Sequence, residues 1–176
     1  MKQQTLNKKD TGEIDRTEIV MHVKDDSDFL SVFSTTETPV ISGQVAEFLD
    51  NATKTIHPDK PLSLKIKGDC IDENERIVYK KAIKEYYSQE LTSVNSEIKV
   101  LNRIAMLLMF FGVIILGIAV FLELKFNSII WSEVVDIVAW VLLWEAVDIK
   151  FFRTRDLAIK RKKVTSFISM PITYEN

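Results

Sequence analysis

An uninterrupted apolar run from Ile104 to Leu122, IAMLLMFFGVIILGIAVFL, constrains this chain more than any other feature. It holds nineteen residues and no charged side chain. A helix rises about 1.5 Å per residue, so the run would extend roughly 28 Å, close to the hydrocarbon thickness of a lipid bilayer. The run begins at residue 104, which is too far along the chain for a signal peptide. We therefore expect a membrane-spanning helix here.

A second apolar run follows at residues 129–152, and charged residues interrupt it. Its middle, residues 137–144, is uncharged, and the acidic side chains lie toward its two ends. Near the membrane surface a charge costs less than the roughly 2.5–3.5 kcal/mol assigned to the bilayer centre. The connection between the runs is short, about residues 123–128. We therefore expect two antiparallel spans, about 104–122 and 129–152, in a transmembrane hairpin over residues 99–152.

Basic residues are concentrated on one side of this expected hairpin. Residues 149–176 carry seven Lys or Arg against two Asp or Glu, whereas residues 104–148 carry one basic residue against five acids. Lys99 and Arg103 precede the first span. Because Lys and Arg favour the cytoplasmic side of a membrane protein, we expect a multi-pass protein with both chain ends in the cytoplasm.

The residues before the first span predict a small α/β domain. Residues 1–16 lack apolar periodicity and are expected to form a mobile arm, and residues 17–98 form the domain. The expected elements are a strand at 18–23, a helix capped by Ser42, a strand at 62–66, a long helix from Asp69 or Asp72 into the first span, and a strand at 164–172. The fold class is thus an α+β membrane protein: a cytoplasmic β-α-β-α domain on a two-helix transmembrane hairpin. The basic tail, residues 153–176, supplies the strand that completes the sheet.

A stripe of acidic and aromatic residues runs along the expected second span. At about 100° per residue, an arc of roughly 120° holds these pore-lining candidates, with Glu145 just beside it: Glu133, Asp136, Trp140, Trp144 and Asp148. Such a stripe must face protein or water rather than lipid. Three interpretations stay open: local neutralisation by basic residues such as Arg103 or Lys125, a cation path in an oligomer with the Trp pair as its constriction, and a proton relay.

Two further patterns concern membrane contacts. Ala105, Gly112 and Ala119 recur every seven residues in the first span, and small residues on one seam allow helices to pack closely. A basic cluster follows the second span and predicts contact with anionic lipid or with another polyanion such as nucleic acid. Its members are Lys150, Arg153, Arg155, Lys160, Arg161, Lys162 and Lys163.

Catalytic chemistry has little support in the sequence. The chain has two histidines, His22 and His57, and no glycine-rich phosphate loop or paired Cys/His spacing. Cys70 is the only cysteine and cannot form an intrachain disulfide. The acidic cluster at residues 25–28 lacks the spacing of a calcium loop and is interpreted as a turn. We therefore expect no enzyme activity, no cofactor and no metal site.

The segment AWVLLWEAVDIKFFRTR, Ala139 to Arg155, resembles a group of small bacterial two-span membrane proteins whose hairpin ends in W-V-x-x-W. The segment YKKAIKEYYSQEL, Tyr79 to Leu91, is similar to the helix that leads into their membrane part. Many of these proteins have Arg-Pro after the second Trp, where this chain has Glu145 and Ala146. In size and architecture the chain is also similar to the membrane effector of Hailong antiphage defence. That resemblance implies a bacterial inner-membrane channel, a tetramer, held shut by a DNA oligomer that a partner nucleotidyltransferase makes.

These patterns and the resemblance together lead to one functional expectation and one alternative. We expect an oligomeric inner-membrane effector that acts as a gated ion channel and depolarises the membrane in antiphage defence. A ligand on the cytoplasmic domain, such as nucleic acid, would control the gate by shifting a population of conformations. The alternative is a membrane-anchored binding or scaffold subunit without a pore. Membrane lipid and further copies of the chain would be its partners.

Overall fold

The computed structural model describes residues 16–126 and 129–175, apart from the side chains of residues 126 and 129–132. The expected mobile arm, residues 1–16, lies outside the described residues except for Arg16. The chain forms two compact units. The α/β unit contains the residues up to Ile83 and those from Ser169 onward, and the helical unit contains Lys84–Ile168.

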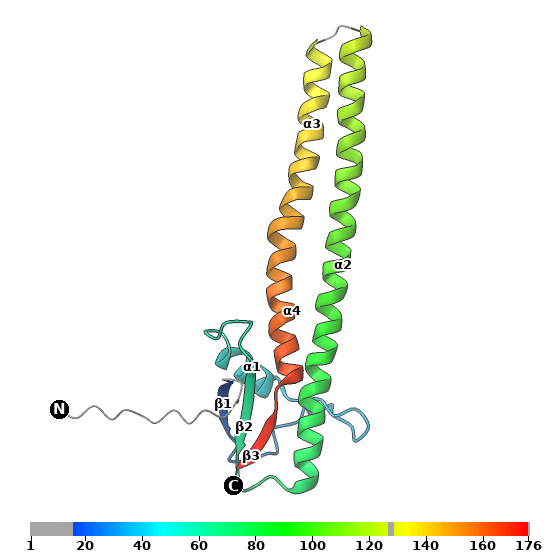
Figure 1. Cartoon of the computed structure of the whole chain (residues 1–176). Coiled ribbons are helices and arrows are strands. Elements are labelled where there is room, and N and C mark those ends of the chain that lie inside the picture. The colour runs from blue at the N-terminus through cyan, green and yellow to red at the C-terminus, as the bar shows by residue number, and fades with distance from the viewer. Residues whose placement is uncertain (1–15, 127–128, 176) are drawn as a thin grey trace, which may run out of the picture. The chain divides into compact units, whose positions relative to one another are not determined.

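A three-stranded parallel sheet forms the centre of the α/β unit, in the order β1-β2-β3 (Figure 1). Its strands, with the helix between the first two, are β1 (Thr17–His22), α1 (Gly43–Ala52), β2 (Leu62–Lys67) and β3 (Ile172–Glu175). The register aligns Thr17 with Leu62 in the first pair of strands and Leu64 with Ile172 in the second. Parallel neighbours require a crossover connection. Helix α1 provides the first crossover, and the helical unit lies in the sequence between β2 and β3.

Burial alternates along β2, whose sequence LSLKIK has an apolar residue at every second position. Leu62, Leu64 and Ile66 are buried, and the residues between them are half-buried. Successive side chains of a strand point to opposite faces, so one face of this sheet carries the core. The buried apolar side chains of the α/β unit are Ile19, Met21, Phe29, Pro39, Ile41, Ala46, Leu49, Leu62, Leu64, Ile66, Ile71, Tyr79, Ala82, Ile83, Met170 and Ile172.

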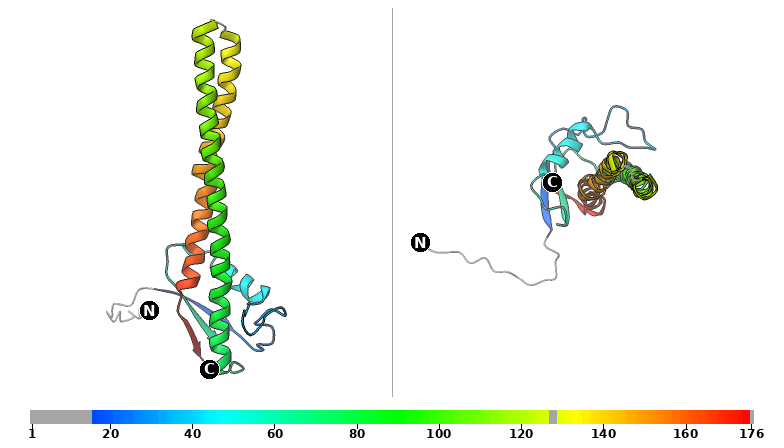
Figure 2. Two further views of the ribbon diagram at one scale, coloured as in Figure 1. Left: turned by 90° about the vertical axis from the view of Figure 1, so that its right-hand side faces the viewer. Right: turned by 90° about the horizontal axis from the view of Figure 1, so that it is seen from above.

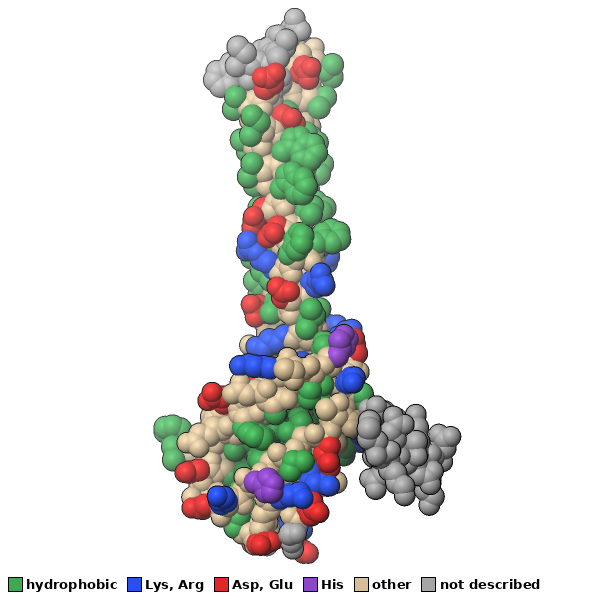
Figure 3. All heavy atoms as spheres, turned by 90° about the vertical axis from the view of Figure 1, so that its left-hand side faces the viewer, with side chains coloured by type: hydrophobic (Ala, Val, Ile, Leu, Met, Phe, Trp, Pro, Cys, Tyr) green, Lys and Arg blue, Asp and Glu red, His purple; other side chains and the backbone are tan. Residues whose placement is uncertain are grey.

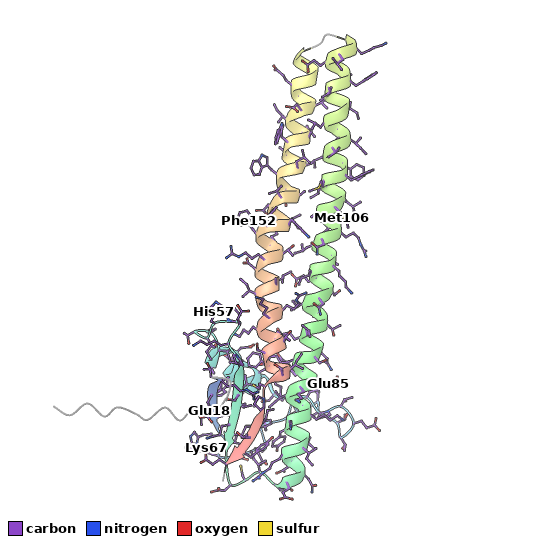
Figure 4. The ribbon with its side chains drawn as sticks, viewed as in Figure 1. Glu18, His57, Lys67, Glu85, Met106 and Phe152 are labelled. Atoms are coloured by element: carbon purple, nitrogen blue, oxygen red, sulfur yellow. The ribbon has the colours of Figure 1, made fainter. Side chains whose placement is uncertain are left out.

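The opposite face of the sheet carries ion pairs between neighbouring strands. Lys65 Nζ lies 3.0 Å from a Glu18 carboxylate oxygen, and Lys67 Nζ lies 2.8 Å from one of Glu175. Figure 4 labels Glu18 on β1 and Lys67 at the end of β2. Because about a third to a half of each of these side chains is exposed, water and salt screen the pairs, and the pairs stabilise the fold only a little.

Side chains cap the two helices of this unit at their first turns. Ser42 Oγ accepts a hydrogen bond from the Val45 amide at 3.4 Å, so Ser42 is the N-cap of α1, as its sequence predicts. At the start of α2 (Glu73–Phe126), the Asp72 amide donates to Glu75 Oε2 at 2.8 Å and the Glu75 amide donates to Asp72 Oδ1 at 2.7 Å. This reciprocal pair satisfies two amides that have no partner inside the helix.

The helical unit consists of the remainder of α2 and a chain that runs back along it (Figures 1 and 2). The returning elements are α3 (Ile129–Asp148), the π-helical turn η1 (Ile149–Arg153) and α4 (Thr154–Ser169). Two contacts mark the antiparallel register. Tyr87 stacks on Phe167 with ring centroids 4.2 Å apart, and Lys160 Nζ lies 3.0 Å from a Glu90 oxygen.

The expectation of two membrane spans is wrong. Within the described residues, α2 is the one helix that is both long enough and apolar enough to cross a membrane. Every 18-residue window of α3 contains at least three acidic residues, because Glu133, Asp136, Glu145 and Asp148 are spread along its 20 positions. The fold is therefore one very long helix, further helices and a small parallel sheet, without a two-span transmembrane hairpin.

The strand expected at residues 164–172 is also wrong. Residues up to Ser169 belong to α4, and β3 begins only at Ile172. The buried side chains Val164, Phe167 and Met170 recur at every third residue, which is the spacing of one helix face rather than of a strand. The basic residues expected in a tail therefore lie on η1 and α4.

Candidate functional site

The apolar segment of α2, residues 104–122, is the most distinctive surface of the helical unit. Only 17% of its most apolar 18-residue window is buried. The core helix of a soluble protein would be mostly buried, and a large exposed apolar surface marks a contact with a membrane or with another protein. Figure 4 shows Met106 on α2 and Phe152 on η1 at about the same level of the helix pair, and both side chains are exposed.

Small residues line the seam at which α3 packs against α2. Ala105, Gly112 and Ala119 of α2 are buried, and so are Ala139 and Ala146 of α3. Both series repeat every seven residues, which keeps the small side chains on one face of each helix. Their size allows the two backbones to approach closely, as in helix pairs within membranes.

A cluster of charged side chains follows at the end of this seam. We call Asn102, Glu145, Asp148, Lys150 and Arg153 the charged collar. Arg153 Nη2 donates to Glu145 Oε1 at 3.1 Å, and its Nε donates to Asp148 Oδ2 at 3.2 Å. Lys150 Nζ donates to Asn102 Oδ1 on α2 at 2.9 Å. The collar thus joins the two helices where the apolar segment begins.

The π-helical turn η1 places Arg153 for these contacts. In a π-helix residue i lies over residue i−5, and Asp148 precedes Arg153 by five positions. The Thr154 hydroxyl and amide both donate to the Ile149 carbonyl oxygen, the hydroxyl at 2.9 Å, which holds the widened turn closed. Single π-turns within α-helices are frequent at functional sites.

The collar neutralises two of the expected pore-lining acids. Glu145 and Asp148 contribute two negative charges, and Lys150 and Arg153 contribute two positive charges. The neutralising group for both acids is Arg153, whereas the sequence suggested Arg103. Sequence reasoning missed Arg153 because a regular α-helix does not align positions five residues apart.

The other pore-lining candidates lie farther along α3. Glu133, Trp140 and Trp144 are exposed, and Asp136 is half-buried. In the part of the chain that the structure describes, neither Glu133 nor Asp136 has an ion-pair partner. Figure 3 shows the left-hand side of the molecule as it is drawn in Figure 1. Apolar side chains cover the upper part of that face of the helix pair, and Asp or Glu and Lys or Arg side chains gather about halfway along it.

The residues of the basic cluster differ in the contacts that they make. Lys150 and Arg153 belong to the charged collar, and Lys160 pairs with Glu90. Lys163 Nζ lies 6.0 Å from the centre of the Phe167 ring. Arg155, Arg161 and Lys162 are exposed on α4, where they are accessible to an anionic partner.

The α/β unit contains an open cavity of about 440 Å³ that the sequence did not reveal. It lies beside the end of β1 and the start of α1, and His22 lines it. His57 lies elsewhere, exposed, with its Nδ1 accepting from the Asp59 amide at 3.3 Å. Among the described residues, no three His, Cys, Asp or Glu side chains are grouped to hold a metal ion.

No match to this chain is found among models of protein families, curated proteins or solved structures.

Proposed function

We propose that this chain is a membrane-anchored binding subunit. Segment 104–122 of α2 is embedded in a lipid bilayer, and the α/β unit binds a ligand or partner at the membrane surface. The observation that supports anchoring is the exposed apolar surface of this segment. Only 17% of the most apolar 18-residue window of α2 is buried. A bilayer is the environment that such a surface matches in length and chemistry.

The charged collar is the boundary between the apolar segment and the headgroups in this proposal. Its Asn102 lies two positions before Ile104, where the apolar segment begins. Lys99 and Arg103 add positive charge to the same stretch of α2 and favour anionic lipid. The positive charge of this stretch favours its placement on the cytoplasmic side of a bacterial inner membrane.

Membrane fractionation of paired arginine variants tests the anchoring. The double substitution Phe110→Arg/Val113→Arg places two charges near the middle of the segment, at roughly 2.5–3.5 kcal/mol each. We expect the variant to leave the carbonate-resistant membrane pellet, in which the wild-type chain stays. The control, Ile77→Arg/Val100→Arg, changes two exposed positions of α2 outside the segment, at 70% and 50% against 61% and 57% for Phe110 and Val113, and should stay in the pellet. Equal extraction of both variants would contradict the proposal.

A gated ion channel is the second candidate function. It is favoured by Glu133 and Asp136, which have no ion-pair partner among the described residues and lie on a helix beside the apolar segment. Copies of the chain would turn these carboxylates toward a shared water-filled path. The resemblance to the Hailong effector would add a tetramer, a controlling DNA oligomer and a nucleotidyltransferase partner.

Membrane-potential dye uptake separates the two candidates. Expression of a channel depolarises cells, and the variant Glu133→Gln/Asp136→Asn should abolish that effect. The matched variant Glu145→Gln/Asp148→Asn changes carboxylates that Arg153 already pairs, and it should leave a channel current largely intact. A flat dye response of the wild-type chain favours the binding subunit without a pore.

A further inference from the structure

Strand β1 is an open edge of the three-stranded sheet. The order β1-β2-β3 pairs β1 on one side only, and Figures 1 and 2 show it at the border of the sheet. Among the described residues, no strand is paired with its other side. Proteins commonly protect such edges with Lys, Pro or a bulge, because unpaired amides and carbonyls bind further strands. The β1 sequence TEIVMH contains neither Lys nor Pro, and its register with β2 is continuous, so this edge is able to accept a strand.

Backbone groups of alternate residues of β1 point to this open edge. The Thr17 amide donates to the Pro61 carbonyl oxygen at 2.9 Å, and the Val23 amide donates to the Lys67 carbonyl oxygen at 2.8 Å. The amides and carbonyls of successive residues in a strand point to opposite sides, so the odd-numbered residues from 17 to 23 face β2. The residues whose backbone groups face the open edge are Glu18, Val20 and His22.

The side chains of these three residues share the outer face of the sheet. They lie at alternate positions, and Ile19 and Met21 between them are buried on the core side. Val20 is 40% exposed, and Glu18 and His22 on either side of it are exposed as well. The edge therefore presents an acid, an apolar residue and a base in that order. This order is complementary to itself when a second strand runs in the opposite direction.

We propose that the β1 strands of two copies pair antiparallel about a two-fold axis at Val20. Val20 then lies opposite the partner's Val20, and Glu18 lies opposite the partner's His22 on both sides of the axis. Cross-strand pairs of apolar residues, and of an acid with a base, stabilise antiparallel strands. A carboxylate accepts several hydrogen bonds, so Glu18 has sites for both Lys65, 3.0 Å away, and the imidazole.

Charge and apolarity select this register from its neighbours. Only the residues with outward backbone groups exchange hydrogen bonds across the edge, so the register changes in steps that keep these residues opposite one another. A register centred on Glu18 sets two carboxylates opposite each other, which is destabilising. Registers centred on Ile19 or Met21 set Val20 opposite Glu18 or His22 instead of a second valine.

A second copy fits this edge because β1 itself supplies each complementary side chain. The contact is isologous, as in most protein dimers, and it joins two three-stranded sheets into one continuous sheet. Antiparallel strands at the edge of otherwise parallel sheets are common. Anchoring in a membrane would raise the local concentration of the copies and strengthen the contact. The inference rests on the α/β unit alone, so it can fail while the membrane anchoring holds.

Disulfide formation between identical single-cysteine variants tests the contact and its register. In a Cys70→Ser background of the full chain in its membrane, cysteine replaces Glu18, Val20 or His22. Opposed hydrogen-bonded residues have Cα atoms about 5.5 Å apart, a distance that a disulfide spans. We expect the highest yield of cross-linked dimer at position 20 and little at 18 or 22, where the two cysteines lie at least roughly 13 Å apart. The matched control is Phe48→Cys on α1, since Phe48 is also 40% exposed, and it should not cross-link.

The pattern of yields decides between the alternatives. Equal yields at 18 and 20, or at 20 and 22, would mean a register centred on Ile19 or Met21 and would overturn the proposal. A yield at 20 no higher than that of Phe48→Cys would overturn it as well. That result is expected if the edge binds a strand of another protein, because two copies of Val20 would then never meet.

Two substitutions of Val20 test the contact without cysteines. Val20→Pro removes an amide that faces the open edge and takes no part in the pairing with β2, and such edge positions accept proline. Val20→Asp keeps the amide and sets two carboxylates opposite each other at the axis. Each should weaken self-association of the purified chain about tenfold or more, measured by sedimentation in detergent, whereas Phe48→Asp should leave it unchanged. Self-association that survives both Val20 substitutions would contradict the proposal.

Discussion

Gly112 sets the distance between α2 and α3. A Cβ atom at this position would lie 2.9 Å from both Cγ and Cδ2 of Leu143, whereas a Cβ at Gly117 would meet nothing within 4 Å. The two glycines are five residues apart on the same helix, yet only one of them faces the partner helix. The seven-residue spacing of small residues identified the relevant one from the sequence, because it marks a single face of a helix.

Gly112→Val should therefore destabilise the helix pair, and Gly117→Val should not. Overpacking of this kind typically costs about 1–3 kcal/mol. The measurement is the free energy of unfolding in detergent, followed by the loss of helical signal as a denaturing detergent is added. Equal effects of the two substitutions would mean that α3 does not pack on this face of α2.

Two tyrosines make the α/β unit sensitive to high pH. The Tyr174 hydroxyl donates to the Arg76 carbonyl oxygen at 2.9 Å, and burial raises the pKa of Tyr174 to about 12. Burial, with the neighbouring Asp26 carboxylate, also raises the pKa of Tyr79. An unfolded chain releases these protons near pH 10, so the folded state favours the protonated phenols.

We expect this stability to be complete below pH 10 and to fall as the pH rises from about 10 toward 12. Denaturant midpoints of the α/β unit, followed in the full chain between pH 9 and 12, measure the effect. Tyr174→Phe removes one titrating group and should show a smaller decrease over the same range. A midpoint that does not change with pH would contradict the account.

At the scale of elements, local sequence patterns predict β2 and α1 but do not predict α4 or η1. Alternation in LSLKIK and the cap at Ser42 predict β2 and α1 because neighbouring residues decide those structures. The C-terminal part of α4 was mistaken for a strand because VTSFISM contains β-branched residues. Its buried positions follow helical spacing instead. The π-turn η1 left no signal in the sequence, since the contacts of Arg153 depend on a local widening of the helix.

The charged collar yields a prediction about this element. Arg153→Gln leaves Glu145 and Asp148 without their cation and should lower the free energy of unfolding by about 0.5–2 kcal/mol, the sum of two partly exposed ion pairs. Adding Glu145→Gln and Asp148→Asn should restore much of the loss. Arg155→Gln, at an exposed position on α4, is the control. Unfolding in detergent measures all three, and failure of the rescue would show that Arg153 acts through packing instead.

At the scale of the whole molecule, the chain leaves the sheet after β2 and returns to it at β3. Both ends of the helical unit therefore connect to one small sheet, in which β2 is hydrogen-bonded to both neighbours. The helix over residues 104–122 was predictable from the uninterrupted apolar run in the sequence. The role of α3 was not, because its acidic residues exclude it as an apolar span while its small residues still pack against α2.

Cysteine labelling tests the central claim, that segment 104–122 lies in a bilayer, most directly. Single cysteines replace Val113 or Val100 of α2 in a Cys70→Ser background, since these valines are 57% and 50% exposed in the chain itself. A charged maleimide is then applied to opened membranes. The account predicts that position 100 reacts and that position 113 is protected until detergent dissolves the bilayer. Equal labelling of both positions in intact bilayers would contradict it.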